Sequence, residues 1–189
     1  MNARALAIGS AGVIAAGLFL VMRPASAHDE PAALWSPGVN TGAVDWSLVR
    51  YFSAREFGGL LASVDPRIIY AADAMRARLG APLQISKAEG AIARFELSAA
   101  PSRHYAVGRK SDALDLHPIG ASLWACYRAA LLVPAIGGFG VYPDWNTPGI
   151  HIDCRPRKPD GSMALWIGES VAGRQVYAGW DAARVQGMA

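Results

Sequence analysis

Two short segments in which apolar and polar residues alternate constrain the fold of this chain more than any other feature. Residues 113–117 read ALDLH and residues 150–153 read IHID. Successive side chains of a β-strand point to opposite faces of a sheet, so each segment is predicted to be a strand with an apolar back and a polar front. The first polar front would carry Asp115, and the second would carry His151.

These polar fronts can share one metal ion with a histidine from a third segment. The chain has four histidines, and His104 lies in the irregular segment 97–110. If the fronts of the two strands face each other, His104, Asp115 and His151 converge. Two imidazoles and one carboxylate are the usual protein ligands of a catalytic zinc ion, which keeps one position open for water. The sequence therefore predicts a metal-dependent hydrolase.

Each of these polar residues also has an ordinary structural interpretation. A single histidine on a strand is more often hydrogen-bonded than metal-bound, and Asp112 and Asp115 can serve as turn and capping residues. Asp153 can pair with Arg155 or Arg157. The metal hypothesis therefore rests on the joint occurrence of these residues beside glycines and a proline-rich loop.

The first 27 residues have the pattern of an export signal. Arg4 precedes an uncharged apolar run over residues 5–22, and residues 25–27 read ASA, a small-residue cleavage site. Cleavage would make His28 the mature N-terminus. An uncleaved run is long enough to remain as a membrane tether. In both cases the rest of the chain is expected outside the cytoplasm, in the periplasm or cell envelope.

The charge of the mature chain gives no reason to expect a nucleic-acid partner. Residues 1–27 contain Arg4 and Arg23 and no acidic residue, so their removal lowers the formal net charge from +3 to +1 (18 minus 2 basic against 15 acidic side chains). The remainder has no block of Lys and Arg interleaved with aromatic residues, which is the pattern that nucleic-acid binding requires.

One folded domain over residues 46–189 is predicted, after a linker over residues 28–45 that is rich in Pro, Gly, Ala and Asn. Helices are expected in a short turn from Ala54, over 66–79 between the Asp65 cap and Gly80, and over 122–133. Strands are expected over 82–86, 113–116, 139–142 and 150–154, with one or two more within 164–180. These elements predict a small α+β domain with a mostly antiparallel sheet and flanking helices.

The two cysteines lie in a compartment that permits disulfides. Cys154 directly follows the second polar strand, so a bridge to Cys126 would join that strand to a helix. The alternative is two separate small buried residues.

Several motifs follow one another along the chain. They are Ser102-x-His104, Ala113-x-Asp115-Leu116, Gly138-x-Gly140-Val141-Tyr142-Pro143 and Gly149-Ile150-His151-Ile152-Asp153, preceded by the segments 52–57, 73–76 and 79–86. In order, spacing and flanking residues, residues 50–156 resemble the zinc D-alanyl-D-alanine carboxypeptidase family of bacterial peptidoglycan peptidases. This family shares its core fold with the hedgehog-like metallopeptidases.

The resemblance implies that His104, Asp115 and His151 bind Zn²⁺. It also implies cleavage of a peptide bond at a D-amino acid in the peptide stems of peptidoglycan. The chain departs from the family in two places. Ten residues separate His104 from Asp115, a longer spacing than is common, so residues 105–112 are interpreted as an insertion. Many members carry a catalytic acid or histidine just before the last ligand, where this chain has Pro148 and Gly149.

The proton-transfer residue of such an enzyme has three candidates. Asp153 is the first because it would share a strand face with His151, and Asp144, on the loop after residues 142–143, is the second. His117, on the face of Asp115, is the third. Each of the three can instead orient a ligand imidazole without touching the substrate.

Basic and aromatic residues near the predicted site are candidates for holding the substrate. Arg94 and Arg103 would suit the carboxylates of peptide stems, although a solvated surface charge is the commoner role of arginine. Tyr142 and Trp145 can line a groove or simply pack locally.

Three other functions fit the same residues. The first is a catalytically inactive module of the same fold that binds the cell wall. The second is a zinc peptidase for ordinary L-peptides. The third is a membrane-tethered structural protein in which the polar residues form only ion pairs. Digestion of sacculi, digestion of casein and the metal content of the protein distinguish these alternatives.

Overall fold

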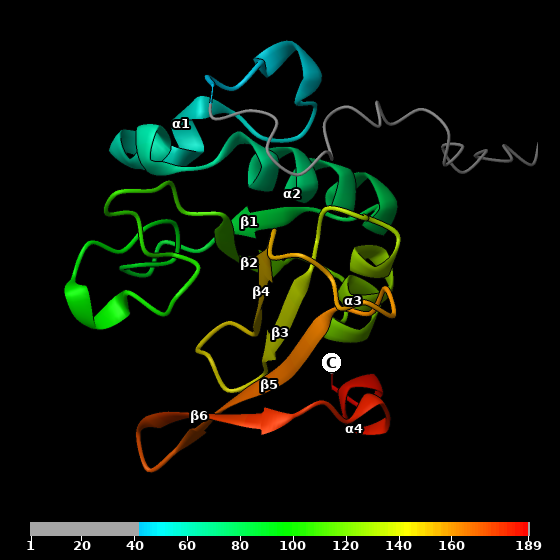
Figure 1. Ribbon diagram of the computed structural model, residues 1–189. Coiled ribbons are helices and arrows are strands. Elements are labelled where there is room, and N and C mark those ends of the chain that lie inside the picture. Colours follow the sequence, from blue (N-terminus) through cyan, green and yellow to red (C-terminus); the bar gives the residue numbers. More distant parts are fainter. Residues whose placement is uncertain (1–41, 189) are drawn as a thin grey trace, which may run out of the picture.

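A six-stranded mixed sheet forms the centre of the computed structural model, which describes residues 42–188 (Figure 1). The spatial order of its strands is β1-β2-β4-β3-β5-β6. Their bounds are Leu83–Ile85 for β1, Ala113–Pro118 for β2, Gly138–Tyr142 for β3, Gly149–Asp153 for β4, Ala164–Val171 for β5 and Arg174–Gly179 for β6. Neighbouring strands are antiparallel except β3 and β5, which are parallel.

Helices cover one face of this sheet. The described residues form α1 (Ala54–Phe57), α2 (Pro66–Leu79), α3 (Leu123–Leu131) and α4 (Ala182–Gln186), with short 3-10 helices at Trp46–Leu48, Gly58–Ser63 and Leu97–Ala99. Helices α2 and α3 contact each other and pack on strands β2, β3 and β4. The long irregular segment 86–112 lies on the other side of the sheet (Figure 1). The helical face and the open face of the sheet are therefore distinct.

Local sequence signals set the limits of α2. The side chain of Asp65 accepts a hydrogen bond from the backbone N–H of Arg67, and Pro66 occupies the first turn, where its missing N–H costs nothing. Gly80 ends the helix with φ of 68°, a left-handed conformation that glycine adopts without strain. The prediction for this helix is confirmed at both ends.

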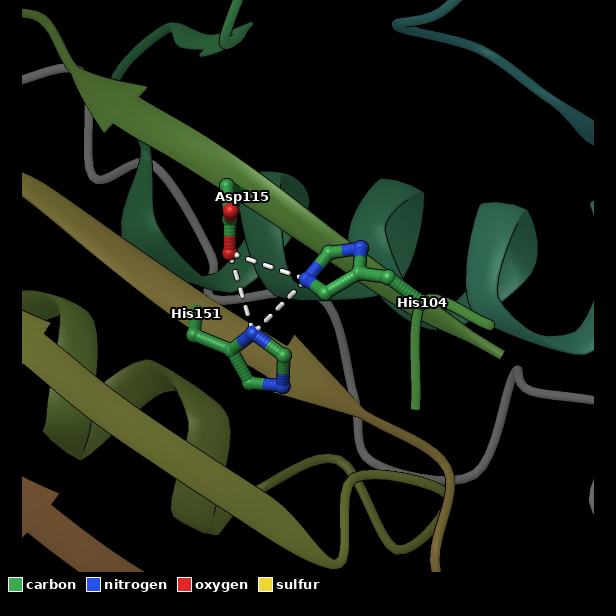
Figure 2. A group of neighbouring side chains, drawn as sticks. All are labelled: His104, Asp115 and His151. Atoms are coloured by element: carbon green, nitrogen blue, oxygen red, sulfur yellow. Dashed lines mark hydrogen bonds and ion pairs between the residues drawn. The ribbon is translucent and has the colours of Figure 1, made fainter. Parts of the chain in front are cut away.

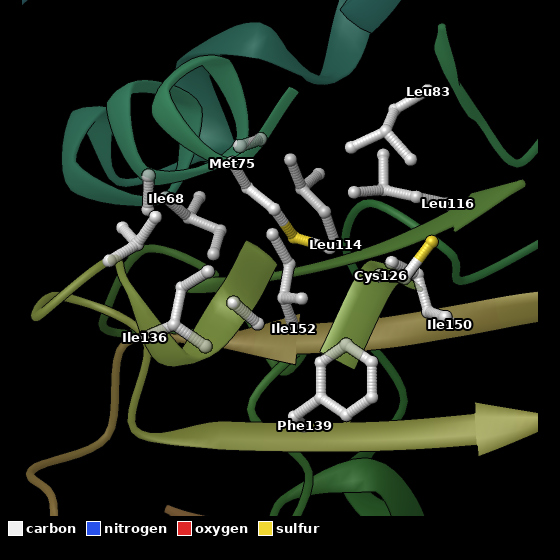
Figure 3. Packing of buried hydrophobic residues seen from close by; sticks show 14 of the residues in the cluster. Ile68, Met75, Leu83, Leu114, Leu116, Cys126, Ile136, Phe139, Ile150 and Ile152 are labelled. Atoms are coloured by element: carbon white, nitrogen blue, oxygen red, sulfur yellow. The ribbon is translucent and has the colours of Figure 1, made fainter. Parts of the chain in front are cut away.

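The hydrophobic core lies between the helices and the back face of the sheet. Leu114 and Leu116 of β2 and Ile150 and Ile152 of β4 are fully buried. Figure 3 shows them packed together with side chains of α2, α3 and β3; the labelled ones are Ile68, Met75, Cys126 and Phe139. A slip of one residue in either strand would move these side chains to the other face, so their burial fixes the register of the two strands.

That register also fixes what lies on the front face. Asp115 pairs with His151 across β2 and β4, and Gly140 pairs with His151 across β4 and β3. The alternation predicted for the two segments is confirmed, since their apolar residues pack into the core and Asp115 and His151 share the opposite face.

The predicted fold class is confirmed at the level of an α+β domain with a mixed, mostly antiparallel sheet and flanking helices. The sequence predicted β5 and β6 only as one or two strands, and the structure forms both. Helix α4 was not predicted. It begins at Asp181, whose side chain accepts a hydrogen bond from the Arg184 backbone N–H.

Part of the predicted organisation lies outside the described residues. The export signal over residues 1–27 and most of the linker over 28–45 belong to that part of the chain. Within residues 42–188, no helix is both long and apolar enough to cross a membrane.

Of the two alternatives for the cysteines, the structure has the separate residues and not the bridge. Cys126 and Cys154 are both free thiols. Cys126 lies on α3 inside the core, near Ile150 (Figure 3). Cys154 follows β4 and lies in the electrostatic environment of Asp112 and Arg67. Although α3 packs on the sheet, the Cys126 thiol therefore does not meet Cys154 at the end of β4.

Candidate metal centre

Three side chains converge on the front face of the sheet, and all three are buried (Figure 2). His104 Nε2 lies 3.2 Å from Asp115 Oδ1 and 3.1 Å from His151 Nδ1. His151 Nδ1 lies 2.9 Å from Asp115 Oδ1. One donor atom of each residue therefore points at a common centre, as the sequence predicted for His104, Asp115 and His151.

Backbone pairing explains how the three residues meet. Asp115 and His151 are directly opposite each other in the β2–β4 register. His104 comes from the irregular segment 86–112, which is fixed by a short bridge between distant residues. The Arg94 backbone N–H donates to the His104 carbonyl at 2.8 Å, and the Ala106 N–H donates to the Arg94 carbonyl at 2.8 Å. These backbone hydrogen bonds fix the position from which the His104 side chain reaches the cluster.

Asp115 and His151 shift each other's pKa in opposite directions. Burial disfavours the ionised form of Asp115, but hydrogen bonds with His104 and His151 outweigh this effect and hold its pKa well below the ordinary value. Burial also disfavours the imidazolium of His151. Its hydrogen bonds with Asp115 and Asp153 prevail and raise its pKa to about 9. The cluster is therefore a site that attracts positive charge.

The donor set fits a metal ion on chemical grounds. When His151 Nε2 donates to Asp153, the lone pair of His151 Nδ1 faces the Asp115 carboxylate at 2.9 Å. Two lone pairs at this distance repel each other unless a proton or a cation lies between them. The donor atoms of the three residues lie within 4.8 Å of one another. This cluster could hold one metal ion, and imidazole with carboxylate suits several divalent transition metals.

Asp112, the aspartate at the end of the segment 105–112, lies outside the cluster. Asp112 forms an ion pair with Arg103 and does not join the cluster. Burial raises the pKa of Asp112, while the guanidinium of Arg103 acts in the opposite direction. Residues 105–112 therefore lengthen the chain between two of the converging residues without supplying a donor to the cluster.

A groove with a volume of about 1440 Å³ opens above the three converging residues. It is lined by residues from the segment 84–103, from the β3–β4 loop and from the β5–β6 hairpin. In Figure 1 the segment 86–112 and this hairpin lie apart on the open side of the sheet. The groove is large enough for a short peptide, since ligand sites typically measure about 300–1,000 Å³.

Asp153, the first candidate for proton transfer, lies behind His151 and not in the groove. Its side chain is fully buried, and Oδ2 lies 3.1 Å from His151 Nε2. The Arg155 side chain hydrogen-bonds the same carboxylate through Nε and Nη2. Asp153 is not among the residues that line the groove. Its position fits the orienting role that the sequence left open.

Asp144 and His117 do line the groove. Asp144 Oδ2 accepts a hydrogen bond from the Ser170 backbone N–H at 3.0 Å, which links the β3–β4 loop to β5. His117 Nδ1 lies 3.3 Å from the Pro148 carbonyl oxygen. Because a carbonyl only accepts, Nδ1 carries the proton in this contact and Nε2 keeps its lone pair.

The Pro148 position thus has an imidazole beside it. The ring of His117 also contacts Trp145, with centroids 5.9 Å apart and the rings edge to face. Gly149 permits this arrangement because a Cβ there would lie 2.6 Å from the Trp145 ring and 3.1 Å from His117 Nδ1. The neighbouring strand β2 thus supplies a histidine beside Pro148.

Arg94 and Arg103, the candidates for substrate binding, both line the groove. Arg94 is 42% exposed and lies 3.8 Å from Glu96, a distant and solvent-screened pair. Arg103 is less exposed and is paired with Asp112. Arg94 is therefore the more available of the two cations.

Aromatic residues close the other side of the groove. Tyr142 and Trp145 stack with centroids 4.1 Å apart, and Trp166 Nε1 donates to the Tyr142 hydroxyl at 2.9 Å. All three rings line the groove, so both readings of Tyr142 and Trp145, packing and lining, apply at once.

Sequence reasoning did not single out Trp166 as part of the site. Its ring lies 5.2 Å from the His151 ring, measured between centroids. The signal was present in Gly140, because a Cβ there would lie 2.3 Å from the Trp166 ring. A glycine inside a buried strand indicates close approach of another group, but it does not say which one.

No family model, curated protein or solved structure matches the chain.

Proposed function

We propose that this chain is a zinc-dependent peptidase that hydrolyses a peptide bond at a D-amino acid in the peptide stems of peptidoglycan. The observation that carries the proposal is the convergence of His104 Nε2, Asp115 Oδ1 and His151 Nδ1 beneath a groove. The motif resemblance supports the substrate class and a fold of the hedgehog-like metallopeptidase type. The proposal includes export to the periplasm or cell envelope.

Zinc is the metal we assign to the site, with His104, Asp115 and His151 as its ligands. Two imidazoles and one carboxylate form a common ligand set of catalytic zinc sites, and the groove gives the site access to solvent. When bound, such an ion polarises a substrate carbonyl and acidifies a coordinated water. Asp115 and His151 lie on paired strands, and His104 lies on a segment held by backbone hydrogen bonds with Arg94.

His117 is the chain's best-placed residue for moving a proton. It lines the groove, and its Nδ1 contact with the Pro148 carbonyl leaves Nε2 able to accept. Asp144 also lines the groove, although one of its oxygens already accepts from Ser170. We assign proton transfer to His117 first and to Asp144 second, with Asp153 in an orienting role.

Arg94 is assigned to the carboxylate of the peptide stem. Its side chain is 42% exposed at the groove, and its backbone is hydrogen-bonded to His104. A guanidinium in this position can bind a carboxylate in a bidentate manner and so orient the substrate relative to the ligand residues.

A second candidate function is a cell-wall-binding module without activity. The observation that favours it is the presence of Pro148 and Gly149 just before His151, where many members of the family carry a catalytic acid or histidine. In this case the groove would bind peptide stems, and no bond would be cleaved.

Mass spectrometry of muropeptides tests the proposal. Purified sacculi are incubated with zinc-loaded protein, with chelated protein and with His151→Ala. New stem-shortened or uncrosslinked muropeptides are expected only with the zinc-loaded parent. Sedimentation of the protein with sacculi without new products would establish the binding module and overturn the peptidase. Cleavage of casein without new muropeptides would move the substrate to ordinary L-peptides.

A further inference from the structure

We propose that Asp153, clamped by Arg155, is a positioning residue of the metal centre that fixes the tautomer of His151. The inference deepens the proposed function and depends on the metal site assigned there. In this role Asp153 touches neither substrate nor reacting atoms. It acts through His151, by directing the lone pair of Nδ1 toward His104 and Asp115.

The contact between Asp153 and His151 has the geometry that this role needs. Asp153 Oδ2 lies 3.1 Å from His151 Nε2, on the side of the ring that faces away from the cluster. A carboxylate only accepts, so Nε2 carries the proton in this contact. In the neutral imidazole, which is the form that binds a metal ion, the remaining ring nitrogen Nδ1 is then unprotonated, and it is the atom that faces His104 and Asp115.

Arg155 holds the Asp153 carboxylate in place from the other side. Its Nε donates to Asp153 Oδ1 at 2.8 Å and its Nη2 donates to Oδ2 at 2.6 Å. The backbone N–H of Arg155 also donates to Oδ1 at 3.0 Å. A bidentate arginine bond fixes both the plane and the position of a carboxylate. The Asp153 carboxylate therefore has one orientation, and its hydrogen bond orients the His151 imidazole in turn.

Two further contacts support this pair. The guanidinium carbon of Arg155 lies 5.3 Å from the centroid of the Trp166 ring, within the range of a cation–π contact. Gly138 of β3 leaves the space that the carboxylate occupies, since a Cβ there would lie 2.3 Å from Asp153 Oδ2. The β3 strand thus has no side chain where the buried Asp153 carboxylate lies.

The two ligand histidines differ in whether the ring nitrogen that faces away from the cluster has a hydrogen-bond partner. Among the described residues, His104 Nδ1 is buried and has no hydrogen-bond partner, whereas His151 Nε2 has Asp153. Hydrogen-bonded partners of metal-binding imidazoles typically contribute about 10–100-fold to metal affinity. The protein's contribution to metal affinity beyond the ligands is therefore concentrated at His151.

The test is the zinc affinity of Asp153→Asn, measured by competition with a chromophoric chelator. The amide can donate to Nε2 and so stabilise the tautomer that carries its proton on Nδ1. We expect zinc affinity to fall by about 10–100-fold and the absorption spectrum of the Co²⁺-substituted protein to change. The matched control is Asp160→Asn, at an exposed aspartate whose side chain accepts hydrogen bonds from Ser162, and it is expected to keep the parent affinity.

Arg155→Lys keeps the charge, loses the bidentate clamp and is a milder second variant. We expect it to weaken zinc binding less than Asp153→Asn, with a native circular dichroism spectrum. Parent-level zinc affinity in both folded variants would overturn the positioning role. If the parent binds zinc but cleaves no muropeptide, the proposed function fails and the positioning role stands. If the parent binds no metal, both fail.

Discussion

Asp115 on β2 and His151 on β4 are direct partners in the antiparallel register, and His151 Nδ1 lies 2.9 Å from Asp115 Oδ1. The pairing that builds the sheet therefore also assembles two thirds of the donor set. The same strands bury Leu114 and Ile152 on the other face. Stability of the core and geometry of the site depend on one register.

Truncation of the back face is expected to destabilise the fold. Ile152→Ala should lower the free energy of unfolding by about 2–5 kcal/mol, because a fully buried side chain leaves a cavity in a close-packed core. Urea titration of chelated protein measures the change. Val171→Ala, at a position that is 55% exposed, is the control and should change it by less than about 0.5 kcal/mol. Equal losses in both variants would contradict the described core.

Gly138→Ala is expected to weaken metal binding without touching a ligand. The added Cβ would lie 2.3 Å from Asp153 Oδ2 and would displace the carboxylate that orients His151. Gly179→Ala on β6, where a Cβ meets nothing within 4 Å, should bind zinc as the parent does. Chelator competition measures both. An unchanged affinity in a folded Gly138→Ala variant would show that the orientation of His151 tolerates this displacement.

His117→Gln is expected to keep zinc and lose turnover. General acid–base catalysis contributes about 10²–10⁴-fold, and the loss of kcat should fall in this range. Asp144→Asn provides the comparison, since it removes the second candidate at the same groove. Release of muropeptides by the zinc-loaded variants gives the rates. A larger loss in Asp144→Asn than in His117→Gln would reverse the assignment of the two roles.

The two thiols should resist modification in the native protein. Burial raises the pKa of Cys126 to about 12, and burial also raises the pKa of Cys154. Little reactive thiolate is therefore present at pH 8. We expect slow reaction with Ellman's reagent in the folded state and reaction of both thiols in guanidinium. Absence of free thiol in the unreduced, unfolded protein would instead indicate the disulfide.

The elements that sequence reasoning placed well are those with local signals. Asp65, Pro66 and Gly80 define the ends of α2 through caps that involve only neighbouring residues. The alternation in β2 and β4 identified their buried faces, and burial of the apolar face then forced Asp115 and His151 to the front. His104 was predicted to join them because two imidazoles and one carboxylate suit a zinc ion. No local rule predicted the path of the irregular segment that carries it.

The features that the sequence left open depend on tertiary contacts. Strand alternation places Asp153 on the face of His151, but it does not say which side of the imidazole the carboxylate approaches. That is decided by Arg155 and by the space that Gly138 leaves. The position of His104 is likewise set by backbone hydrogen bonds between Arg94 and the segment around His104. These bonds join residues that are not neighbours in sequence, and no local sequence pattern predicts them.

Metal content of the purified protein tests the central claim most directly. Inductively coupled plasma mass spectrometry of zinc-reconstituted, desalted parent protein should find about one zinc ion per chain. His104→Ala and His151→Ala should each retain little or none, with folded circular dichroism spectra. Parent protein without bound zinc, or either alanine variant with the full parent content, would contradict the assignment of these residues as ligands of one ion.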